Sequence, residues 1–196
     1  LPPIFEGKTK EITAEGKLPS QGNFVLAGFR APYMSADNTL VQSLVNYILT
    51  DSTSGLFKKR LVDQEKIAAA VEDFNFDYDN GMQKIGIILL PTTKVSQLKT
   101  QVLKIKDDFK NMSEETFNIY KRNLFVAAAE SMQRNAQLGD QLALMWGKSG
   151  DIDLISKFVT APVDVTKEQA QKFMDQYYTK DNFIYLTHKG QSGAAK

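Results

Sequence analysis

The chain has 196 residues, of which 42% are hydrophobic and 24% are charged, a composition typical of a globular protein with a core of its own. Its 24 basic and 23 acidic residues leave a formal charge of +1, which disfavours nucleic acid and anionic lipid as partners because both need a broad positive surface. No cysteine is present, so disulfides, thiol nucleophiles and cysteine-based zinc sites are excluded. The longest apolar run, 85–91, is far shorter than the roughly 20 residues of a membrane-spanning helix.

The ends of the sequence suggest a piece of a longer protein. Leu1-Pro2-Pro3 lacks an initiator methionine and the charged and apolar regions of a signal peptide. At the other end, small and polar residues predict a disordered tail over 191–196. No repeat, linker or low-complexity segment interrupts 8–188, which predicts one compact unit.

Two strands and a helix are predicted first along the chain. Residues 8–13 and 23–30 have strand patterns, and Pro32 ends the second strand. Ser35 offers an N-cap for the following helix, with Asp37 in its first turn. One face of that helix is apolar and is expected to pack against the sheet: Leu40, Leu44, Val45, Ile48 and Leu49.

A short helix over 55–64 is predicted to lead into a β-hairpin. Aromatic and polar residues alternate toward the end of its first strand, 67–78. Asp79-Asn80-Gly81 suits a tight turn because asparagine and glycine tolerate positive φ. The returning strand, 82–90, stops at Pro91, so the two strands should be antiparallel neighbours.

The next part of the chain is predicted to be helical. One helix covers 95 to about 111, and Ser113 opens a longer one with acidic residues 114–115 in its first turn. Gly139 and the segment 147–150 are expected to bend and end this longer helix.

The last elements are two helices and a strand. A short helix over 151–159 precedes Pro162, and Thr166 and Gln169 have capping-box spacing for the last helix. A strand over 183–187 should return to the sheet. The packed face of the last helix is expected to carry Ala170, Phe173 and Tyr177.

This order of elements is not the regular alternation of strand and helix in a parallel α/β protein. It predicts an α+β fold, with a mainly antiparallel sheet of about five strands and helices layered on it. Met132, Met145 and the aromatic residues are expected in the core, and Trp146 is expected to be partly exposed near a helix end.

Metal-binding chemistry is poorly represented in the sequence. His188 is the one histidine, and a single imidazole cannot build a histidine-based zinc site, so we assign it no role. The acidic pairs 107–108, 114–115 and 151/153 lie at expected helix ends, where carboxylates are common, and none has the spacing of a calcium loop.

Nucleophilic and phosphate-binding chemistry is equally poorly supported. Ser52, Ser54 and Ser131 have no recognisable base beside them. Gly147-Lys148-Ser149 matches the end of a phosphate-binding loop, but Leu142 stands where the earlier glycine should be. We therefore assign no catalytic, cofactor-binding or metal-ligating residue.

The segment from Asp51 to Val71 resembles the second-half signature of the M16 zinc proteases, the pitrilysin and mitochondrial processing peptidase family. The resemblance rests on the order and spacing of four pieces: Ile48-Leu49, Ser54-Gly55-Leu56-Phe57, Leu61-Val62-Asp63 and Ile67-Ala68-Ala69-Ala70-Val71. In element order it extends over about 5–190, including Thr-x-Glu at Thr166 and Asp181-Asn182 before the last strand. It implies one M16-like domain.

The resemblance also implies which groups are missing. Active members carry an inverted zinc motif, His-x-x-Glu-His, on the helix equivalent to 36–49, where residues 40–45 of this chain supply no ligand or general base. Second halves often add an arginine and a tyrosine that hold the substrate, and these would fall at Val62 and Ala69. A non-catalytic half-domain without a cofactor of its own is the implied function.

Such a domain faces a catalytic half across a chamber, on the same chain or as a partner subunit, and the zinc is expected in that catalytic half. The domain would help to enclose a peptide or an unfolded protein, because hydrolysis needs water to be excluded. The parent protein or complex would then be a zinc metalloendopeptidase. The absence of cysteine leaves the compartment open, with the bacterial periplasm or cell envelope preferred to the cytoplasm.

Two alternatives remain open. The chain could be a structural or assembly domain with an M16-like fold, as in core subunits of respiratory complexes; a large exposed apolar face and a homodimer would favour this. An independent enzyme of another type is disfavoured because acid, base, nucleophile and metal ligands do not cluster. Stoichiometric zinc in the isolated chain would favour it.

Overall fold

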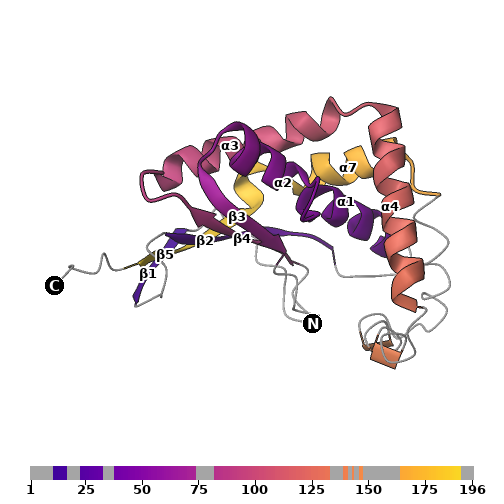
Figure 1. Cartoon of the computed structure of the whole chain (residues 1–196), viewed down its shortest axis with the longest axis horizontal. Coiled ribbons are helices and arrows are strands. Elements are labelled where there is room, and N and C mark those ends of the chain that lie inside the picture. The colour runs from indigo at the N-terminus through magenta and orange to yellow at the C-terminus, as the bar shows by residue number, and fades with distance from the viewer. Residues whose placement is uncertain are drawn as a thin grey trace.

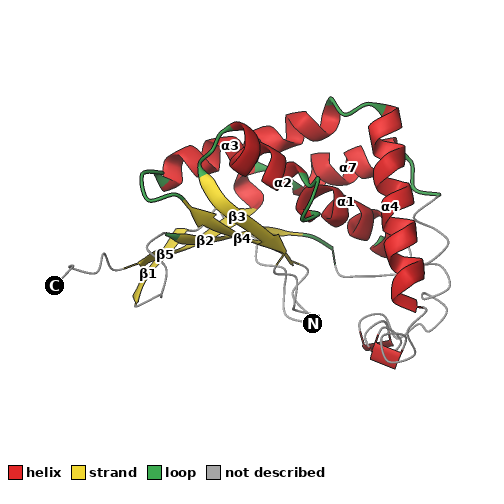
Figure 2. Ribbon diagram, in the orientation of Figure 1, coloured by secondary structure: helices red, strands yellow, loops and turns green. Residues whose placement is uncertain are grey.

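The computed structural model describes residues 11–16, 23–32, 38–73, 82–132, 139, 140, 143, 146, 147 and 164–190. The strands are β1 (Glu11–Gly16), β2 (Phe24–Arg30), β3 (Ala68–Asp73), β4 (Met82–Leu89) and β5 (Phe183–Gly190). The helices are α1 (Thr39–Thr50), α2 (Leu56–Lys58), the π-helix η1 (Lys59–Gln64), α3 (Val95–Lys110), α4 (Glu114–Met132) and α7 (Lys167–Tyr177), and a 3-10 turn covers Lys180–Asn182. The five strands form one sheet, and α1, α2, α3 and α7 lie on one side of it (Figures 1 and 2).

The sheet has the strand order β1-β5-β2-β4-β3 and confirms the predicted α+β fold. Antiparallel pairs join β2 to β4, β2 to β5 and β3 to β4, so the sheet is mostly antiparallel as predicted. The exception is β1, which pairs in parallel with β5 at the opposite end of the sequence. The first and last described strands therefore lie side by side.

The core lies between the sheet and the helices. Alternate residues of β2 and β4 point toward the helices and are fully buried, as strand periodicity requires. Helix α1 buries four of the five residues of the predicted apolar stripe, while Leu40 is only partly buried, and α3 buries residues at helical spacing. Each fully buried aliphatic or aromatic side chain stabilises the fold by roughly 1.5–3 kcal/mol relative to exposure. The largest of these side chains include Phe29, Phe57, Phe109, Phe117, Tyr178 and Phe183.

Two predicted helix starts are confirmed by their hydrogen bonds. The Ser113 hydroxyl accepts from the backbone N–H of Thr116 at 3.1 Å, which caps α4. Thr166 accepts from the N–H of Gln169 at 3.1 Å, while the Gln169 side chain accepts from the Thr166 N–H at 2.8 Å. This reciprocal pair is the predicted capping box of α7.

Several predicted boundaries differ from the structure or lie outside its described part. Helix α1 begins at Thr39 with Asn38 at the N-cap position, whereas the predicted cap, Ser35, is not among the described residues. Strand β5 runs beyond the predicted 183–187, because the pairing with β1 continues to Gly190. Trp146 is 58% exposed, as expected. The predictions for 8–10, 74–81, 151–159 and the tail 191–196, and for the Met132 and Met145 side chains, concern residues outside the described part of the chain.

Candidate functional site

The turn between α1 and α2 is held by one carboxylate. Asp51 accepts hydrogen bonds from the N–H groups of Thr53 and Ser54, at 3.2 and 2.7 Å, and from the Ser54 hydroxyl at 2.8 Å. Burial alone would raise the pKa of Asp51, but these hydrogen bonds outweigh burial and lower it. Helix α4 also contacts the turn, because the Tyr120 hydroxyl donates to the Ser54 carbonyl. The turn is therefore a fixed structural element. The Ser54 hydroxyl is bonded to the Asp51 carboxylate, whose lowered pKa makes it a weak base, and this bond holds the turn.

The predicted helix 55–64 is interrupted by a π-helix. After one turn of α2, the chain forms η1, in which the N–H of Glu65 donates to the carbonyl of Arg60 at 2.9 Å, five residues back. Lys66 then takes a positive φ of 51°, which lets the chain reverse into β3. Because π-helices in proteins often occur at functional sites, this segment is a candidate for one.

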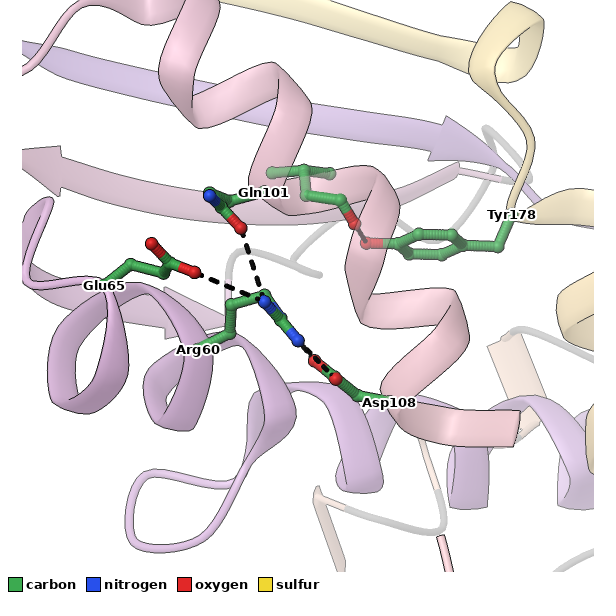
Figure 3. A network of polar contacts seen from close by, with 6 residues as sticks. Arg60, Glu65, Gln101, Asp108 and Tyr178 are labelled. Carbon is green, nitrogen blue, oxygen red and sulfur yellow. Dashed lines mark hydrogen bonds and ion pairs between the residues drawn. The ribbon is translucent and has the colours of Figure 1, made fainter. Parts of the chain in front are cut away.

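The side chain of Arg60 joins η1 to α3 (Figure 3). Its guanidinium forms a bidentate pair with Asp108, and it also donates to Gln101 at 3.3 Å and lies 3.5 Å from Glu65. The hydrogen bonds to Asp108 raise the pKa of Arg60. On the far side of α3, the buried Tyr178 hydroxyl donates to the Val102 carbonyl at 2.7 Å. Arg60 is thus occupied by a structural ion pair.

The two positions at which the resemblance led us to expect assisting residues are apolar and lie in different elements. Val62 lies in η1, half-buried against the core. Ala69 is exposed in β3, at the irregularity where the register with β4 shifts between Ala68 and Ala70. Arg60 stands only two residues before Val62, but its pairing with Asp108 commits it to the fold.

Helix α1 is packed where the zinc motif would lie. Leu44 and Val45 are buried in the core, and Leu40 and Val41 pack against it. Gln42 is 5% exposed, and its Oε1 has no hydrogen-bond partner among the described residues. Across the described part of the chain, no three histidine, cysteine or acidic side chains lie close enough to hold a metal ion.

A surface hollow of about 300 Å³ lies beside η1, where α3 ends and α4 begins. Two of its polar groups already serve the fold, because Asp108 pairs with Arg60 and Ser113 caps α4. Tyr120 donates to the Ser54 carbonyl, and no histidine or cysteine is among the described lining residues. The described lining consists of Leu56, Lys59, Gln64, Asp108, Asn111, Met112, Ser113, Thr116 and Tyr120.

The other sequence candidates are dispersed. His188 lies in β5, paired with Phe24 of β2, away from the acidic residues of α3 and α4. Glu114 and Glu115 are exposed in the first turn of α4, the position that the helix dipole favours for carboxylates. Asp151, Asp153, Lys148 and Ser149 lie outside the described residues, as does the Ser131 side chain. Among the described residues, no helix is long and apolar enough to cross a membrane.

No protein-family model matches this chain, and no curated protein does. Solved structures do match it. A protease from Helicobacter pylori superposes with a TM-score of 0.84 at 13% identity, over 95% of this chain and 45% of that one. A peptidase M16 inactive domain from Pseudomonas fluorescens gives 0.75 at 18% identity, over 96% of this chain and 45% of that one. The inactive peptidase domain of a zinc protease from Bordetella parapertussis gives 0.75 at 19% identity, over 92% and 97%.

These likenesses concern the whole described fold and not one motif. This chain spans somewhat less than half the length of the Helicobacter and Pseudomonas chains, but almost all of the Bordetella one. The predicted resemblance to M16 second halves is thereby confirmed at the level of structure. The chain has the fold of the solved M16 inactive peptidase domains.

Proposed function

We propose that this chain is the non-catalytic half-domain of an M16 zinc protease and closes a peptide-binding chamber opposite a catalytic half. The observation that carries the proposal is the packing of α1. At 40–45, where active members hold the zinc, the side chains are apolar, hydroxyl or amide groups packed on or into the core. A helix packed in this way cannot hold zinc through these side chains.

The remaining groups support the same interpretation. Val62 and Ala69 cannot donate hydrogen bonds from their side chains to a substrate or a tetrahedral intermediate. The nearby Arg60 is held by Asp108. What the domain offers is a rigid wall of sheet and helices, and a zinc hydrolase needs such a wall because excluding water strengthens the electrostatic interactions at its metal.

The proposal implies a zinc-bearing half on the same polypeptide or on a partner subunit, with a peptide or unfolded protein as substrate. Structural neighbours that are about twice as long as this chain have room for such a second half. The parent protein or complex would be a zinc metalloendopeptidase, and residues 5–190 would form one of its domains.

The test is a peptide hydrolysis assay with a catalytic half that carries His-x-x-Glu-His and is encoded on the same or an adjacent reading frame. We expect this half to cleave an unstructured peptide faster when the present chain is added or fused. A catalytic half with its motif glutamate replaced by glutamine controls for contaminating proteases. Equal rates with and without the present chain would contradict the proposal.

A structural or assembly role is the second candidate, and exposed apolar residues favour it. Ile12 and Leu186 on the sheet and Ile119 and Val126 on α4 are all more than one-third exposed. A domain that assembles without taking part in proteolysis would form a stable complex or homodimer but leave the hydrolysis rate unchanged. Light scattering after gel filtration, run beside the hydrolysis assay, separates the two functions.

A further inference from the structure

The hollow of about 300 Å³ beside η1 has an apolar floor. The floor consists of Leu56, Met112 and Tyr120, which are 6%, 8% and 6% exposed. Tyr120 is fixed in place, because its hydroxyl donates to the Ser54 carbonyl and its ring packs edge-on against Tyr47, with the ring centroids 6.3 Å apart. Pockets for small ligands typically begin at about this volume. The hollow therefore has the size and the rigid apolar floor of a small ligand site.

The edge of the hollow carries polar side chains that the fold does not use. Three of them, which we call the rim, are Lys59, Gln64 and Asn111. All three are exposed, and none forms a side-chain hydrogen bond or ion pair with another described residue. The other polar lining groups are engaged: Asp108 pairs with Arg60 (Figure 3), and the hydroxyls of Ser113 and Thr116 share a hydrogen bond. The rim is therefore the part of the lining that is free to bind a ligand.

The charge of the rim determines which ligand group suits it. Lys59 carries the one charge that is unpaired in the described lining, because both carboxylate oxygens of Asp108 accept from the Arg60 guanidinium. The acidic residues 114–115 follow Ser113 in the sequence but are not among the described lining residues. An ammonium and two amide groups together offer several donors, and a carboxylate accepts several hydrogen bonds at once. The rim thus suits a carboxylate and disfavours a cation.

We propose that the hollow binds an apolar carboxylic acid, with its carboxylate at the rim and its alkyl group on the floor. This chemistry has two sources, a free aliphatic acid and the C-terminal residue of a peptide, because both hold a carboxylate a few atoms from an alkyl group. The binding requires neither zinc nor a catalytic half. The inference therefore goes beyond the proposed function and is tested on the isolated chain.

Methionine-methyl NMR tests the proposal, because Met112 lies in the floor, whereas Met174 is fully buried in the core and does not line the hollow. The probe is N-acetyl-leucine, and its neutral control is N-acetyl-leucine amide, which has the same alkyl group. We expect the acid to shift the Met112 signal with a Kd in the millimolar range and to leave the Met174 signal unchanged. The amide should bind at least about fivefold more weakly, because it lacks the charge. Met112→Leu, which removes the signal, assigns it.

Two lysines that are neighbours in the sequence give a matched pair of variants. Lys59→Gln removes the rim charge, whereas Lys58→Gln makes the same change at a side chain that donates to the Thr53 carbonyl and does not line the hollow. We expect Lys59→Gln to weaken binding of N-acetyl-leucine by about fivefold without affecting the amide, and Lys58→Gln to leave both within about twofold. Asn111→Ala, a second rim variant, should weaken binding of the acid by at least about twofold. Melting temperatures confirm that each variant folds.

Two further probes distinguish the sources of the ligand. Tighter binding of the tripeptide Ala-Ala-Leu than of 4-methylpentanoate would assign the hollow to a peptide C-terminus, and the reverse order would assign it to a free acid. Both results support a carboxylate site.

Three results would overturn the proposal. They are equal affinity for the acid and the amide, equal effects of the two lysine variants, and a Met112 signal that does not move at tens of millimolar acid. None of these measurements involves hydrolysis, so this site and the proposed function fail separately.

Discussion

Arg60 is the residue whose loss should most weaken the packing of η1 on α3. Its side chain is only 16% exposed, and its guanidinium forms a bidentate ion pair with the two carboxylate oxygens of Asp108. Asp108→Asn keeps the shape and one acceptor oxygen but removes the charge, so the guanidinium loses its bidentate ion pair and keeps a long contact to Glu65 and a hydrogen bond to Gln101. We expect the free energy of unfolding to fall by about 2 kcal/mol in urea titrations, as for hydrogen bonds to partly buried charges.

Asp107→Asn is the matched control, because it changes the neighbouring carboxylate on the same turn of α3. Asp107 is exposed and contributes to Arg60 only through the longer-range field, the last of the causes that raise the pKa of Arg60. The change should stay within about 0.5 kcal/mol. Equal effects of the two substitutions would show that the ion pair with Asp108 has no special weight.

At the residue scale, the sequence could predict which groups are missing but not which are paired. Leu40, Leu44 and Val45 are apolar in the printed sequence, so their inability to bind zinc needs no structure. The Arg60–Asp108 pair joins residues 48 positions apart, and nothing in local spacing connects them. Without the structure, Arg60 could have passed for a displaced assisting arginine.

At the element scale, the turn into α2 should depend on Gly55. A Cβ at this position would lie 2.6 Å from the backbone N and O of Asp51 and 2.9 Å from the Leu49 carbonyl oxygen. Backbone atoms cannot move aside as a flexible side chain can, so Gly55→Ala should cost about 1–3 kcal/mol of stability. Thermal and urea unfolding measure the loss.

Gly139→Ala is the control for this substitution. Nothing lies within 4 Å of a Cβ built there, and the residue is helical and exposed. Removing a glycine from a helix should be neutral or stabilise the protein by up to about 1 kcal/mol. A similar loss in both variants would contradict the prediction, because it could not come from the contacts with Asp51 and Leu49, and the lower entropy of the unfolded chain would stabilise both.

The elements that were predicted well are those with local signals. Ser113 and Thr166 mark helix starts by side-chain caps, and the stripe of α1 follows from its period. The π-helix could not be predicted, because its extra residue per turn leaves no mark on residue types between Lys59 and Gln64. The sequence therefore predicted a helix at this place but not its form.

At the scale of the whole molecule, the class of fold could be predicted from the sequence, but the pairing of the first described strand with the last could not. An order of elements without βαβ alternation indicated an α+β fold, and the sheet confirms it. The parallel pairing of β1 with β5 depends on contacts between the two ends of the chain, which periodicity does not report. The number of helix layers on the sheet could not be predicted either, because the sequence pattern of an apolar strand such as β2 does not show whether one or both faces of the sheet are covered.

The folded chain should neither bind zinc nor be stabilised by it. The chain has one histidine and no cysteine, and no metal-binding cluster lies among the described residues. A ligand at 100 times its dissociation constant would add about 2.7 kcal/mol, which for a domain of this size raises the melting temperature by about 2–4 °C per kcal/mol. We therefore expect the same melting temperature in zinc and in EDTA, and substoichiometric zinc by elemental analysis. One bound equivalent with a higher melting temperature would instead mark the chain as a metalloprotein in its own right.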